Sequence, residues 1–225
     1  MSLIAIVGDV HGNIAGMYRL VEHHNASHAC TIEVVLQTGD MGAFPDLDRL
    51  DSATLKHAAK DATELGFMEF ARGERVAPVP MFFTAGNHED FDFLESHQGR
   101  SLDPAGWICC LSDGSITTVT AGVRGVKGDR RKYVSEAACL RLMEFKAGAA
   151  DILLCHDAPY SPDHEGYAQG SPEVATVVQC LQPRYVFHGH TSGHQPPWSM
   201  GRSQMFGLNQ PSLIKIAGRD GGMAL

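Results

Sequence analysis

The sequence predicts an α/β fold, in which strands buried in sheets alternate with helices that cover them. Short apolar runs bounded by turn residues recur along the chain, and segments with helical periodicity lie between most of them. Strands are expected over residues 3–7, 33–37, 80–84, 116–121, 151–155 and 184–187. Helices are expected over residues 14–24, 53–70, 135–146 and 172–181.

The last of these helices has a clear start signal, because Ser171 can cap it and Pro172 suits its first turn. Beyond it, residues 205–208 and 213–216 are expected to pair as two closing strands, and residues 218–225 to form a loose tail. Nothing in the composition marks a boundary between domains. We therefore interpret residues 1–225 as a single domain.

Composition and charge exclude several classes of protein. Hydrophobic residues make up 44% and charged residues 20%, which is too balanced for a disordered or a membrane protein. The net charge of -8 argues against a protein that coats nucleic acid through a broadly basic surface. No apolar run is long enough to span a bilayer, and the first residues do not resemble a signal peptide. The six cysteines form no CxxC pair, so we expect reduced thiols and a cytoplasmic location.

Polar side chains gather directly after five of the predicted strands. The chain reads GDVHG after the first strand, GDMG after the second and GNHE after the third, then HD after residues 151–155 and HGH after residues 184–187. In an open α/β sheet, residues just beyond the carboxyl ends of the strands face one crevice, where ligands bind. The sequence therefore predicts that these five loops build one site.

The five loops supply two carboxylates, one carboxamide and five imidazoles, which are the side chains that bind metal ions. They are Asp9, Asp40, Asn87, His11, His88, His156, His188 and His190. Mixed oxygen and nitrogen ligands without thiolate suit Mn, Fe, Zn, Co or Ni better than the all-oxygen sites of Ca or Mg. The alternative is an accidental cluster, or a degenerate site kept only as a scaffold.

In this order, the motifs GDVHG, GDMG, GNHE, a single histidine and HGH resemble those of the calcineurin-like metallophosphoesterases. The resemblance covers most of the chain and implies a four-layer αββα sandwich of two mixed β-sheets flanked by helices. It also implies two divalent metal ions, for which we favour Mn. Carried over by position, the first ion is expected to bind Asp9, His11, Asp40 and His190, and the second Asp40, Asn87, His156 and His188.

The same resemblance implies hydrolysis of a phosphate ester by a hydroxide that bridges the two ions. His88 follows the ligand Asn87 but is not itself a ligand in the family, so it is our candidate for the general acid that protonates the leaving group. Asp157 is a candidate for orienting the imidazole of its neighbour His156.

Substrate contacts are expected from three further residues. Asn13 stands where the first helix begins, and free backbone N–H groups there favour a phosphate. The second motif lacks the arginine of the GDxxDRG pattern found in phosphoprotein phosphatases, so another cation is needed to bind the phosphate. Arg124 and Arg130, in a Gly-rich basic segment, are our candidates.

A more specific resemblance links residues 65–190 to the catalytic domain of the RNA lariat debranching enzymes. The segments EFARGE, APVP, DILLCHDAP and GSP carry it. It departs at Asp9, where those enzymes have cysteine, and we expect much of their C-terminal extension to be absent. The hypothesis is a phosphodiesterase acting on a phosphate ester, with nucleotide or RNA among the possible substrates. A phosphomonoesterase for a small metabolite or nucleotide, and a non-catalytic scaffold, are the alternatives, and no oligomeric state is predicted.

Overall fold

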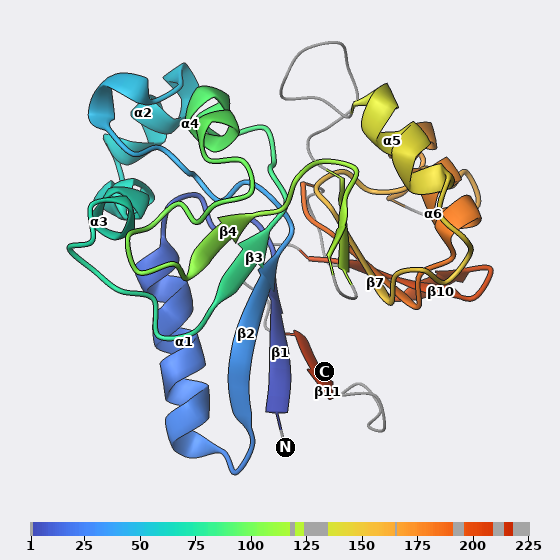
Figure 1. The fold of residues 1–225 in the computed structure, drawn as a ribbon, viewed down its shortest axis with the longest axis horizontal. Helices are drawn as coiled ribbons and strands as arrows, with labels where there is room; N and C mark the ends of the chain where they lie inside the picture. Colours follow the sequence, from blue (N-terminus) through green and yellow to red (C-terminus); the bar gives the residue numbers. More distant parts are fainter. Residues whose placement is uncertain are drawn as a thin grey trace.

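The computed structural model of the chain describes residues 2–117, 120–123, 135–164, 166–190, 196–208 and 214–217. Two β-sheets pack face to face, and helices cover the outer face of each sheet (Figure 1). The fold is therefore the α/β sandwich that the sequence predicts.

The first sheet contains the N-terminal strands in the order β11-β1-β2-β3-β4. Its strands are β1 (Ser2–Val7), β2 (Thr31–Gln37), β3 (Met81–Phe83), β4 (Ile108–Cys110) and β11 (Ile214–Ala217). The strands β1 to β4 run parallel, and β11 pairs antiparallel with β1. The carboxyl ends of β1, β2 and β3 consequently lie at one edge of the sheet.

The second sheet has the order β5-β6-β7-β8-β10-β9. Its strands are β5 (Ile116–Thr117), β6 (Thr120–Val123), β7 (Ile152–Cys155), β8 (Tyr185–His188), β9 (Trp198–Met200) and β10 (Ser203–Gly207). The four central strands are parallel, and the outer strands β5 and β9 are antiparallel to their neighbours. Both sheets are therefore mixed.

The helices lie in the segments that connect the strands. They are α1 (Ile14–Ser27), η1 (Leu47–Arg49), α2 (Ser52–Ala58), η2 (Ala62–Leu65), α3 (Phe67–Ala71), α4 (Phe91–Ser96), α5 (Glu136–Met143) and α6 (Pro172–Leu181). Figure 1 shows α1 and α3 outside the first sheet and α5 and α6 outside the second.

Alternation of side chains along the strands produces the layers. In β1, Ala5 and Val7 pack with α1 on the outer face, whereas Ile6 packs between the sheets. In β8, Val186 packs with α6 on the outer face, whereas Phe187 packs between the sheets. Each sheet is thus apolar on both faces, as a strand buried between two layers requires.

Most predicted elements are present within a few residues of their expected bounds, and the start of α6 is confirmed in detail. The hydroxyl of Ser171 accepts the backbone N–H of Val174, and Pro172 occupies the first turn. The prediction of one helix over residues 53–70 is wrong, because this segment folds as α2, η2 and α3. The carboxylate of Asp61 accepts the backbone N–H of Thr63 and starts a new turn there.

The prediction that two closing strands pair with each other is also wrong. The strand β10 joins the second sheet beside β8, whereas β11 joins the first sheet beside β1. The chain thus returns from one sheet to the other, which sequence patterns alone do not reveal. The predicted loose tail at residues 218–225 lies outside the described residues.

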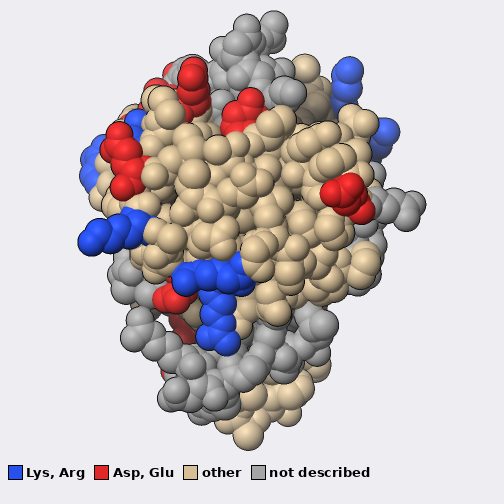
Figure 2. Space-filling model, turned by 90° about the vertical axis from the view of Figure 1, so that its right-hand side faces the viewer, with Lys and Arg blue, Asp and Glu red and all other residues tan. Residues whose placement is uncertain are grey.

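In the described part of the chain, no helix combines the length and the apolar character needed to cross a membrane. All six cysteines are free thiols. Figure 2 shows the face on the side of the second sheet, where charged side chains surround a wide uncharged area. Among the described residues of this face there is no broad basic surface, in keeping with the net charge of -8.

Candidate metal centre

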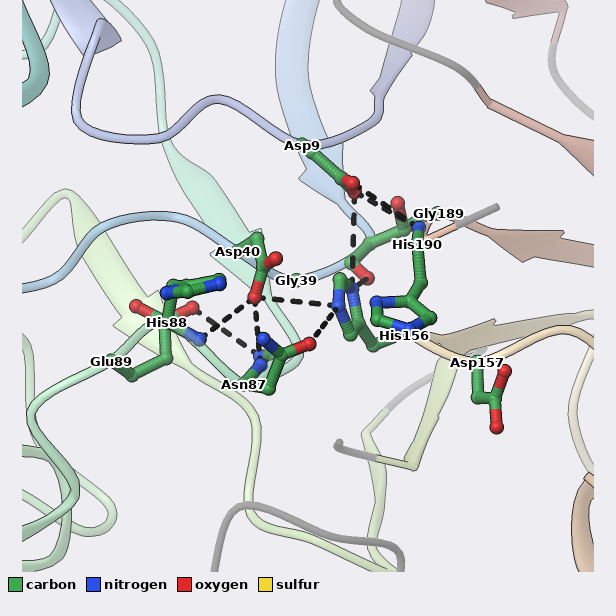
Figure 3. Close-up of polar contacts among 12 residues, drawn as sticks. Asp9, Gly39, Asp40, Asn87, His88, Glu89, His156, Asp157, Gly189 and His190 are labelled. Carbon is green, nitrogen blue, oxygen red and sulfur yellow. Dashed lines mark hydrogen bonds and ion pairs between the residues drawn. The ribbon is translucent and has the colours of Figure 1, made fainter. Parts of the chain in front are cut away.

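The polar motifs converge where the carboxyl ends of strands from both sheets meet. Asp9 follows β1, Asp40 follows β2, Asn87 follows β3, His156 follows β7 and His190 follows β8. Figure 3 shows their side chains directed toward one another from these separate loops. The sequence prediction that the loops share one site agrees with this arrangement.

The backbone of three of these loops is held in a conformation that side chains rarely adopt. His11, Asp40 and His190 have φ angles of 44°, 53° and 60°, and the structure describes only one other non-glycine residue with positive φ, Gln182. This left-handed region costs energy for residues with a Cβ atom. Strain of this kind concentrates at functional sites.

Asp40 occupies the centre of the cluster. Its Oδ1 atom accepts the backbone N–H groups of Asn87 at 2.7 Å and His88 at 2.9 Å, and it lies 3.3 Å from Nε2 of His156. Its Oδ2 atom lies 3.9 Å from Nε2 of His11. Burial opposes ionisation, but the charge and hydrogen bond of His156, together with the charges of His88 and His11, hold the pKa of Asp40 below its usual range.

Two groups of ligand atoms share the Asp40 carboxylate. The atoms of Asp9, His11 and Asp40 lie within 4.8 Å of one another, and so do those of Asp40, His156 and His190. Burial raises the pKa of Asp9 to about 6, because a carboxylate removed from water is costly to ionise without a cation nearby. A donor set of carboxylates and imidazoles without thiolate therefore fits divalent ions such as Mn or Zn.

His156 is oriented for ligation by the backbone that follows β2. Its Nδ1 atom lies 3.1 Å from the carbonyl oxygen of Thr38, so a proton on Nδ1 donates there and the lone pair of Nε2 faces the cluster. Nε2 lies 3.1 Å from Oδ1 of Asn87, which brings the predicted carboxamide ligand into the same group. Although burial opposes it, Asp40 raises the pKa of His156 to about 9, so a metal ion competes with a proton for Nε2.

His188 is not brought to the cluster. Its Nε2 atom lies 3.0 Å from the hydroxyl of Tyr167, its side chain is fully buried, and burial lowers its pKa to about 4. Because side chains alternate along β8, His188 falls on the outer, helix-covered face with Val186. The cluster instead includes His190. The structure thus differs from the prediction in two respects: His188 lies outside the cluster, and His190 lies with Asp40 and His156 rather than with Asp9 and His11.

His88 has a partner that the sequence did not suggest. Its Nδ1 atom lies 3.0 Å from Oδ2 of Asp51, the residue that caps α2. This hydrogen bond raises the pKa of His88. Its ring centroid lies 5.6 Å from that of His11, next to the first ligand group.

Two buried polar side chains hold the motif loops in register. The amide of Gln37 donates to the carbonyl oxygen of Gly8 at 2.9 Å and accepts the backbone N–H of Gly39 at 2.9 Å. The carboxylate of Glu89 accepts the backbone N–H groups of Met41 and Ala43, both at 2.8 Å. Burial raises the pKa of Glu89 to about 7. Sequence reasoning assigned no role to either residue, and only the place of Glu89 within GNHE and of Gln37 two residues before GDMG could have suggested them.

The remaining predicted residues have varied outcomes. The side chain of Asn13 caps α1 by accepting the backbone N–H of Gly16 at 3.0 Å. The carboxylate of Asp157 accepts the backbone N–H of Ala158, and Figure 3 shows it apart from the cluster, so the carbonyl of Thr38 orients His156 instead. Arg124 and Arg130 lie outside the described residues.

Two mixed sheets with a cluster of oxygen and nitrogen ligands at their common edge define an α/β metalloenzyme domain. Residues 2–206 match the family model for calcineurin-like phosphoesterases, so the chain belongs to this family. The family uses divalent metal ions. The fold class and the family predicted from the motifs are both confirmed.

Curated relatives support the second resemblance as well. The chain is 23% identical to the lariat debranching enzyme of Arabidopsis thaliana and 25% identical to that of Drosophila melanogaster, in each case over 83% of its length. It spans 54% and 42% of these two relatives, about half their length. Among solved structures, the protein TT1561 of Thermus thermophilus shares the fold, with a TM-score of 0.59 at 16% identity over 92% of this chain and 89% of that one.

Proposed function

We propose that the chain is a dinuclear metal-dependent phosphodiesterase in which Asp40 is shared by two divalent ions. The observation that carries this proposal is the position of the Asp40 carboxylate, which belongs to both groups of ligand atoms. Two divalent ions held close together repel each other unless a shared anion screens them. The first ion would be held by Asp9, His11 and Asp40, and the second by Asp40, Asn87, His156 and His190.

When bound, such a pair of ions activates a water for attack on phosphorus and neutralises charge on the phosphoryl group. The residues of this chain provide the rest of the chemistry. Thr38 fixes the ring of His156, so that Nε2 is presented as a ligand. His88, held by Asp51 beside the first ligand group, serves as the general acid for the leaving oxygen.

The similarity to lariat debranching enzymes supports a diester rather than a monoester, with a nucleotide or RNA as substrate. The mixed donor set supports Mn, Fe, Zn, Co or Ni, and we favour Mn. The free thiols support a cytoplasmic location. We keep the interpretation of one domain, since core residues of both sheets pack together between them.

The test is hydrolysis of bis-p-nitrophenyl phosphate by protein of known Mn content. We expect turnover by the wild type and a loss of at least about a hundredfold in Asp40→Asn, together with fewer bound ions. Asp46→Asn is the matched control, because Asp46 pairs with Arg72 at the surface, and it should behave as the wild type. Exclusive turnover of p-nitrophenyl phosphate would indicate a monoesterase. Poor metal retention with no turnover would indicate a scaffold.

A further inference from the structure

A groove of about 600 Å³ leads away from the first ligand group. Asp9 and His11 line one end of it, and residues of α1 and η2 line the rest. Its volume falls in the range of pockets that bind small ligands, about 300–1,000 Å³. The groove is therefore large enough to hold a group attached to a phosphate at the metal centre.

The two walls of the groove are held together by close backbone contact. Gly12 has a φ of 79°, and a Cβ atom there would lie 1.9 Å from the carbonyl oxygen of Glu64 in η2. Any side chain at this position would push η2 away from the first motif. Asn13 and Leu20 mark the extent of the α1 wall, and the helix between them corresponds to about 10 Å.

Arg19 is the one lysine or arginine among the described residues that line the groove. Its side chain is exposed, and no described residue forms a hydrogen bond or ion pair with it. Six other described arginines have a hydrogen-bond or ion-pair partner, namely Arg49, Arg72, Arg75, Arg100, Arg141 and Arg202, and Arg184 lies over the ring of Tyr185. A guanidinium without a partner beside a phosphate-ester site is suited to bind a further oxyanion in a bidentate manner.

The opposite wall provides acceptors and the floor provides apolar surface. Glu64 lines the groove with a carboxylate that can accept hydrogen bonds from hydroxyl groups. The exposed Leu20 supplies apolar contact area. A ligand with hydroxyl groups, a flat apolar part and a second phosphate matches this lining.

We propose that the groove between α1 and η2 is a subsite for one nucleoside of a phosphodiester, and that Arg19 binds a second phosphate carried by that nucleoside. This inference rests on the proposed function, because the scissile phosphate must lie at the metal centre. It makes Arg19 a specificity-determining residue. The preferred substrates are then oligonucleotides rather than diesters without a second phosphate.

The test compares the dinucleoside monophosphate ApA with its phosphorylated forms pApA and ApAp. In Mn-loaded wild type, kcat/KM for one of the phosphorylated forms should exceed that for ApA by about tenfold, as expected for one charge-assisted contact. Which form is preferred identifies the nucleoside that occupies the groove. In Arg19→Ala the ratio should fall to about one. Arg184→Ala, which removes an exposed arginine outside the groove, should keep the ratio of the wild type.

A binding measurement separates this inference from the proposed function. Adenosine 3′,5′-bisphosphate and AMP are titrated into the same proteins by calorimetry. The bisphosphate should bind the wild type about tenfold more tightly than AMP, and Arg19→Ala should abolish the difference. Hydrolysis of ApA with no preference for a second phosphate, or a preference that survives in Arg19→Ala, would overturn the subsite and leave the phosphodiesterase intact. Absence of hydrolysis together with an Arg19-dependent difference in binding would support the phosphate contact of Arg19 and contradict the phosphodiesterase.

Discussion

The Nδ1 atom of His88 lies 3.0 Å from the Oδ2 atom of Asp51, a contact that ties the loop after β3 to the start of α2. The other carboxylate oxygen of Asp51 accepts the backbone N–H groups of Ala53 and Thr54. Asp51 is therefore fixed by the helix before it meets the imidazole. Its hydrogen bond assigns Nδ1 of His88 to Asp51 and leaves Nε2 for the proposed transfer of a proton to the leaving group.

Asp51→Asn should impair catalysis while the metal content stays unchanged. The variant keeps the oxygen that caps α2 but can no longer stabilise a protonated His88. We expect kcat/KM for a diester with an alkyl leaving group to fall by about tenfold to a hundredfold, because a general acid contributes about that much or more. A p-nitrophenolate leaving group needs no proton, so kcat/KM for a diester with this leaving group should fall by no more than about threefold. Equal losses for both leaving groups would mean that Asp51 acts only on the structure.

The sequence could predict His88 but not Asp51, and the reason is physical. GNHE is a short motif whose chemistry is evident from its residues, whereas Asp51 stands 37 positions earlier, just before a segment that looks like ordinary helix. The prediction of secondary structure was wrong for the same segment, since residues 53–70 form three short helices instead of one long helix. Local aspartates that cap turns, such as Asp61, are weak signals beside a continuous helical pattern.

Gln37→Met should weaken metal binding through the backbone of the first two motifs. Methionine has a similar volume but leaves the carbonyl of Gly8 and the N–H of Gly39 without this partner. We expect a loss of about 1–3 kcal/mol in the free energy of unfolding, measured with denaturant. The Kd for Mn, measured by calorimetry, should rise by about tenfold, because Asp9 and Asp40 follow these two glycines directly. Gln204→Met, on an exposed position of β10, is the matched control and should change neither quantity.

His190→Gln should reduce metal binding and turnover, whereas His188→Gln should reduce only stability. His190 belongs to a ligand group, so its loss should lower the number of bound Mn ions toward one and reduce turnover by about a hundredfold or more. His188 contacts Tyr167 in the core, so its loss should cost about 1–3 kcal/mol of stability and leave the metal stoichiometry unchanged. Tyr167→Phe removes the same hydrogen bond from the other side and should reproduce the effect of His188→Gln. If His188→Gln loses metal while Tyr167→Phe has no effect, His188 is a ligand after all.

Strand alternation explains why the HGH motif misled the sequence prediction. Both histidines match a ligand pattern, but β8 extends through His188, which places its side chain on the outer face. The chain then turns, and His190 reaches the centre with a φ of 60°. Its backbone N–H donates to the carboxylate of Asp9 at 3.2 Å. Where a strand ends decides which histidine of such a pair faces the site, and sequence periodicity fixes that end only within a few residues.

Removing the ions should lower the thermal stability of the wild type but not of Asp40→Asn. Without ions, Asp9 and Asp40 are two carboxylates in one buried cluster, and burial raises the pKa of Asp9 to about 6. Mn that binds only the folded protein adds about 2.7 kcal/mol of stability at a hundred times its Kd. For a chain of this size, that corresponds to a rise of about 5–10 °C in Tm over the chelator-treated protein. Asp46→Asn should show the same rise as the wild type. A rise of equal size in Asp40→Asn would show that Mn binds elsewhere, because loss of the shared carboxylate removes a ligand from both groups at once.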